Sequence, residues 1–178
     1  MRGWLVGLLT NLRGMALRRP GIAMVIRVAD SGELDTLIEV QEKANLESLS
    51  GIFGPEHPLP THKIALRWRE AFARPENRFA VCERGARVVG VTMVSPPWLH
   101  ALQVLPEHWG HGVGAALHDD AITAIRAVGA QEALLRTFAK NSRARRFWEK
   151  QGWEKVPGFA LRHQDPPHAQ LLVYAKLL

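Results

Sequence analysis

Gly110, Gly112 and Gly114 alternate at the centre of the sequence, and their spacing indicates a binding loop. They follow an apolar, strand-like run at residues 99–105, and a helical pattern begins at Val113. Glycines let a backbone approach a ligand without steric conflict. The first N–H groups of a helix have no intrahelical partner and carry the positive end of the helix dipole. The stretch therefore predicts an anion site, most naturally for phosphates.

Three kinds of phosphate loop compete for this stretch. A nucleotide P-loop needs Gly-Lys-Ser/Thr, whereas two alanines follow Gly114. A Rossmann fingerprint is met formally from Gly110 to Ala115, but residues 106–109 separate the strand from the glycines. The acid that this fingerprint wants about 20 residues later corresponds to Glu132, which begins the next strand instead of ending it. The third alternative is an acyl-CoA loop.

A second stretch favours the acyl-CoA loop. Residues 141–153, NSRARRFWEKQGW, resemble the signature Asn-x-x-Ala-x-x-Phe-Tyr-x-x-x-Gly-Phe of the GNAT N-acetyltransferase family. The first signature of that family, Gln/Arg-x-x-Gly-x-Gly/Ala after a Val-x-Pro-like element, resembles residues 104–114, with Trp109 at its first position. Because both signatures occur in the expected order, the chain resembles small bacterial members of this family from about residue 25 onward.

The resemblance implies an α/β fold, mixed α+β: a mixed central sheet of about six or seven strands flanked by four helices. In that fold the central strands splay, and the pantetheine arm enters between them like an extra strand. We expect this domain at residues 24–178, preceded by a basic, apolar extension at residues 1–23.

Periodicity and breakers predict the elements of this domain. A first helix follows Asp30 or Ser31 and continues through Ala44. The other predicted helices span residues 61–74, 114–128 and 142–151, and the predicted strands span residues 25–28, 79–82, 88–94, 99–105, 133–138, 153–156 and 170–177. Loops at residues 48–60 and 156–168 are the candidate walls of the acceptor site.

Composition bounds the class of protein. The 178 residues suit one domain with an ordinary core, and the single cysteine, Cys82, allows no internal disulfide and fits a reducing cytoplasm. The net charge of +6 favours acidic ligands. We expect no nucleic-acid partner, because the basic residues are scattered, and no membrane span, because the uncharged run at residues 3–12 is too short.

By resemblance, the cosubstrate is acetyl-CoA. The backbone N–H groups of residues 110–115 would bind its pyrophosphate, and the side chains of His111, Arg143 and Arg145 could add positive charge nearby. The Asn141 amide would bond the pantetheine arm, although asparagine here also suits a helix N-cap. The expected cofactor-binding residues are Val104, Leu105, Trp109, Gly110, His111, Gly112, Val113, Gly114, Ala115, Asn141, Ala144 and Phe147.

Acyl transfer from a thioester needs a stabilised oxyanion and a neutral amine. The resemblance implies that the backbone N–H of Val104, or of Leu105, polarises the thioester carbonyl. His100 is the candidate base because imidazole titrates near neutrality, and strand alternation predicts that it shares a side with Val104 and Leu102. A lone histidine in a strand is usually structural, and Glu83 with a water chain competes for this role.

The sequence departs from the family at the general acid. Trp148 occupies the position of the tyrosine that protonates the leaving thiolate, and an indole N–H does not titrate. Tyr174 belongs to the last predicted strand and to the core. We expect no metal site, because His108 and His111 precede a helix whose interior holds His118.

The sequence thus predicts an enzyme that moves acetyl from acetyl-CoA to an amine by direct attack, through a tetrahedral intermediate. The alternative is an acyl-CoA-binding module with weak or no activity, which the tryptophans at positions 109 and 148 favour. The amine acceptor is unidentified, and the resemblance leaves a homodimer open.

Overall fold

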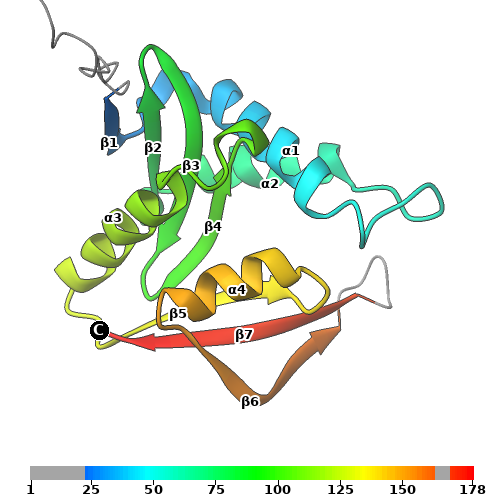
Figure 1. The fold of residues 1–178 in the computed structure, drawn as a ribbon. Helices are drawn as coiled ribbons and strands as arrows, with labels where there is room; N and C mark the ends of the chain where they lie inside the picture. The colour runs from blue at the N-terminus through cyan, green and yellow to red at the C-terminus, as the bar shows by residue number, and fades with distance from the viewer. Residues whose placement is uncertain (1–22, 163–168) are drawn as a thin grey trace, which may run out of the picture.

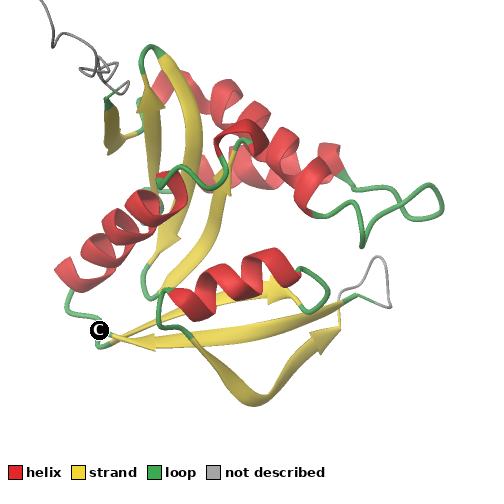
Figure 2. Cartoon of the chain, in the orientation of Figure 1, coloured by secondary structure: helices red, strands yellow, loops and turns green. Residues whose placement is uncertain are grey.

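The computed structural model describes residues 23–162 and 169–178. Seven strands form one sheet in the order β1-β2-β3-β4-β5-β7-β6 (Figure 1). The strands are β1 (Met24–Val28), β2 (Arg78–Arg84), β3 (Arg87–Ser95), β4 (Trp98–Val104), β5 (Glu132–Phe138), β6 (Glu154–Arg162) and β7 (Gln170–Leu177). The α-helices of this part of the chain are α1 (Leu34–Ser48), α2 (Thr61–Phe72), α3 (Val113–Ala127) and α4 (Ser142–Lys150). The predicted mixed α/β fold is confirmed (Figure 2).

Two pairs of helices cover opposite faces of the sheet. Alternation along β2 sends Val81 into a cluster with Leu37 of α1 and Trp68 of α2, while Cys82 packs with Leu117 of α3. Leu135 of β5 joins a cluster that α3 and α4 cover. The helices α1 and α2 therefore cover one face of β2–β4, and α3 and α4 lie on the opposite face of the sheet.

The sheet opens in its middle. β4 and β5 are parallel and pair only at Trp98 with Leu134 and at Leu99 with Leu135. Beyond these residues the two strands diverge, as Figure 1 shows. The splay that the family resemblance implied is confirmed. It leaves the β5-facing edge of β4 without a strand partner from Leu102 onward among the described residues.

A bulge in β4 makes one expectation wrong. Met93 pairs with Ala101 and Val94 with Leu99, so His100 is an extra residue in its strand. Leu99 and Leu102 consequently both pack on the face of α3 and α4. The imidazole of His100 instead stacks on Trp98, at 6.2 Å and 22°, on the face of α1 and α2. His100 therefore does not share a side with Leu102 and Val104.

One strand differs from its prediction. β6 runs over Glu154–Arg162, longer than the predicted residues 153–156, with a register shift between Lys155 and Ala160. The predicted loop at residues 156–168 is therefore a strand up to Arg162, and residues 163–168 lie outside the described part. Residues 1–22 of the expected N-terminal extension also lie outside it. No helix among the described residues is long and apolar enough to cross a membrane.

Candidate functional site

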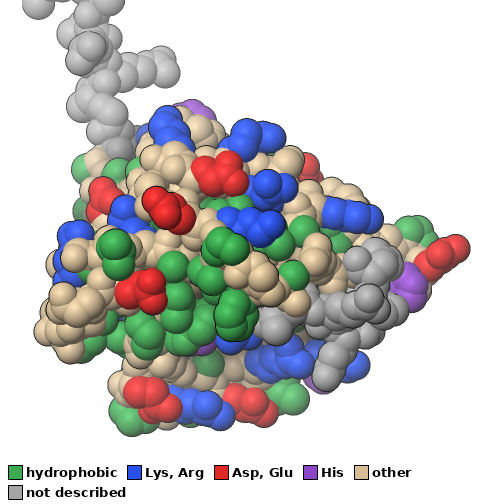
Figure 3. Space-filling model, turned by 90° about the horizontal axis from the view of Figure 1, so that it is seen from below, with side chains coloured by type: hydrophobic (Ala, Val, Ile, Leu, Met, Phe, Trp, Pro, Cys, Tyr) green, Lys and Arg blue, Asp and Glu red, His purple; other side chains and the backbone are tan. Residues whose placement is uncertain are grey.

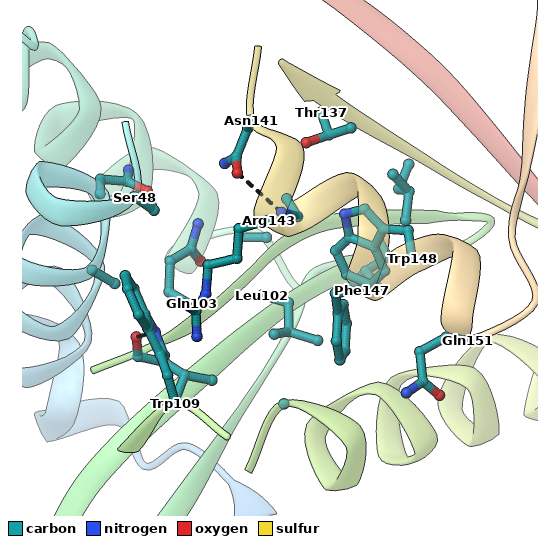
Figure 4. A pocket seen from close by; sticks show the side chains of 18 of the residues that line it. Ser48, Leu102, Gln103, Trp109, Thr137, Asn141, Arg143, Phe147, Trp148 and Gln151 are labelled. Atoms are coloured by element: carbon teal, nitrogen blue, oxygen red, sulfur yellow. Dashed lines mark hydrogen bonds between the residues drawn. The ribbon is translucent and has the colours of Figure 1, made fainter. Parts of the chain in front are cut away.

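A cavity of about 640 Å³ occupies the space that the splay opens. Its walls come from the end of α1, from β4 and β5, from the loop before α3, and from α4 (Figure 4). Nine of the twelve expected cofactor-binding residues line it: Val104, Trp109, Gly110, Gly112, Gly114, Ala115, Asn141, Ala144 and Phe147. Leu105 and Val113 are instead buried in the core, and His111 is an exposed loop residue outside the lining.

One end of the cavity is rich in unused backbone donors. Within the described residues, no N–H from Gly110 to Ala115 donates a hydrogen bond, and the first amide that does is that of Ala116, to the Gly112 carbonyl at 3.1 Å. Gly110 and Gly112 reach this geometry with φ of +79° and +83°, which L side chains rarely adopt. These donors, at the positive end of the α3 dipole, can bind a phosphate.

α3 and α4 pack together at Gly114. A Cβ at this position would lie 3.4 Å from Cε2 of Phe147, within van der Waals contact of the ring. The two signature stretches, far apart in the sequence, are thus in direct contact at the cavity wall.

Hydrogen-bond register decides which amides of β4 face the cavity. The N–H of Leu105 donates to the Val89 carbonyl at 2.9 Å, so it is already used. In an antiparallel ladder alternate residues bond the same neighbour, so the N–H groups of Gln103 and Ala101 also face β3. Those of Leu102 and Val104 face the gap. Leu105 is therefore excluded as the donor to a thioester carbonyl, and Leu102, which the sequence did not single out, joins Val104 as a candidate.

Trp109 lies over the free edge of β4. Its Nε1–H donates to the Val104 carbonyl at 2.7 Å. The guanidinium of Arg143 stacks on its ring, with Cζ 3.7 Å from the centroid (Figure 4). Burial lowers the pKa of Arg143, and the charge of Arg146 lowers it further. Arg143 thus brings positive charge to the cavity, whereas Arg145 bonds the Ala139 carbonyl at 3.3 Å and lies outside the lining.

The side-chain oxygen and nitrogen of Asn141 have different roles. Its Oδ1 accepts the Ala144 N–H at 3.0 Å, so it caps α4. No described residue bonds its Nδ2, and the side chain lines the cavity. The helix-cap interpretation is confirmed, and the amide nitrogen stays available to a ligand.

His100 lines the cavity from β4. Burial lowers the pKa of its imidazole, and the positive charge of Arg136 lowers it further. The ring is therefore neutral at physiological pH and can accept a proton. Glu83, the competing base, is bound to Arg27 on β1 and does not line the cavity.

Trp148 and Tyr174 lie as the sequence suggests, and neither is a free acid. Trp148 lines the cavity and is 7% exposed, packed against Phe147 and Trp153 at centroid distances of 4.8 and 5.8 Å. Tyr174 is fully buried, and its hydroxyl donates to Glu149 at 3.0 Å. It lies outside the cavity lining, so it cannot reach a ligand held there.

A histidine that the sequence analysis considered only as a metal ligand supports this aromatic group. His118 is buried, accepts the Trp153 Nε1–H at its Nε2 at 3.1 Å, and contacts Asp119 through Nδ1 at 2.9 Å. Its Nδ1 therefore carries the proton in the neutral ring, and burial lowers its pKa. No three metal-binding side chains gather anywhere in the described ranges.

The cavity wall also contains polar residues that the sequence did not identify individually as site residues. They are Asn45 and Ser48 of α1, Gln103 of β4 and Arg136 of β5. The Oε1 of Gln103 is buried without a hydrogen-bond partner among the described residues. Ser48 is the first residue of one predicted acceptor wall, whereas residues 156–160 of the other are not part of the lining. Asn45, Gln103 and Arg136 lie far apart in the sequence, so no sequence pattern indicated that they would share one cavity.

The sequence profile of the acetyltransferase (GNAT) family matches residues 43–153. No curated protein matches the sequence.

Solved structures share the fold. The PaiA N-acetyltransferase of Thermoplasma acidophilum, in complex with coenzyme A, is 20% identical with a TM-score of 0.68, covering 88% of this chain and 99% of that one. The ribosomal-protein-alanine N-acetyltransferase of Brucella melitensis is 21% identical with a TM-score of 0.66, covering 86% and 99%. YjaB of Escherichia coli, in its apo form, is 21% identical with a TM-score of 0.67, covering 86% and 97%.

Proposed function

This chain belongs to the GNAT acetyltransferase family, and from that premise we propose that it transfers the acetyl group of acetyl-CoA to an amine. The amine attacks the thioester directly, through a tetrahedral intermediate. The observation that carries the proposal is the cavity itself: unbonded amides of residues 110–115 at one end and the free edge of β4 along its length.

The direction of β4 determines which end of the cosubstrate lies at which end of the cavity. The loop with the free amides follows the C-terminal end of β4, so a pyrophosphate bound there lies beyond Val104. The pantetheine arm then runs back along β4, past the N–H and carbonyl of Val104, as a neighbouring strand would. Because a strand rises about 3.3 Å per residue, Leu102 lies about 7 Å further along this path. The thioester therefore lies between Leu102 and His100.

Two groups support the chemical step at that position. The N–H of Leu102 faces the gap and can donate to the thioester carbonyl as it becomes an oxyanion. The neutral imidazole of His100 can take the proton of the attacking amine, directly or through a water. His100 and Leu102 are two residues apart on β4, and both line the cavity.

The leaving thiolate receives no proton from a tyrosine in this arrangement. Trp148 can donate a hydrogen bond to the sulfur but cannot transfer a proton. A thiol with a pKa near ~8.5 leaves tolerably as the thiolate at neutral pH. We therefore propose a slower enzyme than one with a titrating acid, by about 10² to 10⁴ in rate.

The loop glycines provide the test. Gly112→Ala forces a side chain into a φ of +83°, and we expect acetyl-CoA affinity to fall roughly 5- to 30-fold, the equivalent of about 1–2 kcal/mol of left-handed backbone strain. Gly129→Ala is the matched control, because Gly129 has a φ of +81°, open surroundings and no place in the cavity. Isothermal titration calorimetry measures the affinities. An affinity that both variants change equally contradicts the binding loop.

The non-catalytic alternative also has specific support. Trp148 provides no titrating group, and Trp109 already bonds the Val104 carbonyl that the arm would use. Release of free thiol from acetyl-CoA with a panel of amines separates the two functions. Thermal stabilisation by acetyl-CoA without amine-dependent thiol release would leave a binding module, and no stabilisation at all would exclude both.

A further inference from the structure

Arg136 occupies a particular place in the cavity. It is the first residue of β5 after the last β4–β5 pair, Leu99 with Leu135, so it lies where the strands begin to part. Leu135 packs on the face of α3 and α4, and Arg136 therefore projects from the opposite face, as Phe138 does toward Phe53. Its side chain is exposed and lines the cavity together with His100.

The guanidinium of Arg136 lies over the ring of Trp98. Its Cζ lies 4.6 Å from the centroid of the Trp98 ring, and His100 stacks on that same ring. A guanidinium that stacks by its face keeps its N–H edge free, and that edge matches the two oxygens of a carboxylate. The effect of Arg136 on the pKa of His100 agrees with their closeness.

Charge in the cavity is one-sided. Arg136, Arg143 and Lys150 line it, and no aspartate or glutamate of the described residues does. Some arginines outside the cavity pair with acids, as Arg69 does with Asp35 and Arg87 with Glu107. Arg136 has no such partner in the described part of the chain. A cationic amine alone would therefore meet no complementary charge here, whereas an acceptor with its own anion would.

The phosphates of the cosubstrate do not supply that anion. Resting on the proposed function, the pyrophosphate lies at residues 110–115, beyond the C-terminal end of β4. Arg143, stacked on Trp109, is the cation of that end. Arg136 lies at the other end of the pantetheine path, opposite His100, where the acceptor must enter.

We propose that the acceptor is an amino acid and that Arg136 binds its carboxylate while its amine attacks the thioester. Paired strands lie about 4.8 Å apart, and His100 and Arg136 each directly follow the last β4–β5 pair, Leu99 with Leu135. Groups held at these two side chains therefore belong to one small molecule whose amine and carboxylate are a few bonds apart. The nitrogen forms a bond to the carbonyl carbon and gives its proton to His100. The carbon–sulfur bond then breaks, and the thiolate leaves with the electron pair. Gln103 and Ser48 also line the cavity and can contact the rest of the acceptor.

The test compares the twenty standard amino acids with their carboxamides as acceptors, by thiol release. A charge-assisted bidentate contact predicts that kcat/KM for the best amino acid exceeds that for its carboxamide by about 10- to 100-fold. The carboxamide is a stringent control, because losing the carboxylate charge lowers the pKa of the amine and makes it easier to deprotonate. Arg136→Gln should remove the preference, mainly through KM, and leave the Kd of acetyl-CoA unchanged. Arg126→Gln, an exposed arginine of α3 outside the cavity, should change neither.

The outcomes separate this inference from the proposed function. If carboxamides or the N-terminus of a peptide react as well as free amino acids, the substrate assignment is wrong and the acetyltransferase assignment stands. Acetyl-CoA binding without thiol release from any amino acid also overturns the assignment. If acetyl-CoA does not bind, the proposed function itself fails. A preference that survives Arg136→Gln shows that another group binds the carboxylate.

Discussion

Replacing Trp109 with phenylalanine tests whether its indole N–H and the cosubstrate compete for the carbonyl of Val104. The indole Nε1–H donates to the Val104 carbonyl at 2.7 Å, along the path that we assign to the pantetheine arm. Phenylalanine keeps an aromatic ring beneath Arg143, which stacks at 3.7 Å, and removes only the donor. The arm then no longer has to displace a hydrogen bond when it pairs with Val104.

The expected magnitude follows from that single bond. A neutral hydrogen bond contributes about 0.5–1.5 kcal/mol to stability. Because tenfold in affinity corresponds to about 1.4 kcal/mol, acetyl-CoA should bind Trp109→Phe about 2- to 12-fold more tightly. The free energy of unfolding without ligand should fall by a similar amount, about 0.5–1.5 kcal/mol.

Calorimetric titration with acetyl-CoA and urea unfolding of the ligand-free protein measure the two quantities. Trp153→Phe is the matched control: it also removes a buried indole donor, to His118 at 3.1 Å, but outside the cavity. It should lower stability without tightening acetyl-CoA. The reasoning is refuted if Trp109→Phe leaves the affinity unchanged or weakens it, because the carbonyl is then not part of the arm's path.

Three further predictions concern the base, the leaving group and a distant ion pair. His100→Gln should lower kcat/KM by about 10²- to 10⁴-fold. Because burial and Arg136 lower the pKa of His100, the wild-type rate should rise with pH through a midpoint below 6.5. If the variant keeps the same pH profile, His100 is not the base. Trp148→Tyr should raise kcat, measured by thiol release, without changing acetyl-CoA affinity, and a lower kcat would assign the indole another role. Hydrogen bonds from Arg27 lower the pKa of Glu33 to about 2, so this carboxylate stabilises the fold above its unfolded pKa of about 4.5 and the benefit is lost as pH falls toward 2. Thermal melting of Glu33→Gln should show a weaker loss of stability over that range than the wild type, and identical pH dependence would contradict the assignment.

The fold was largely predictable because its determinants are local or short in range. The spacing of apolar residues, together with the breakers between segments, predicted every strand and α-helix of the described residues, with errors mainly at the element ends. β6 was the largest error: a loop was predicted from residue 156 onward, whereas pairing with β7 resumes at Ala160. Partner strands override local breakers, and no single-strand pattern contains that information.

The cosubstrate end of the site was predictable for a similar reason. Donors at residues 110–115 come from one turn of chain, whose glycines and following helix fix where the N–H groups point. The family resemblance indicated that this loop and residues 141–153 belong to one site. In the structure the two stretches meet where Phe147 packs against Gly114.

By itself, the sequence determined the binding loop, the two signatures and the order of elements, because each depends on residues close together in the chain. Only the tertiary structure decided which amides of β4 remain free, on which face His100 lies, and that Arg136 stands beside it. These depend on ladder register, on one bulged residue and on the parting of two parallel strands. One residue of register reverses the direction of every following N–H and side chain, and that register is set by packing across the whole sheet.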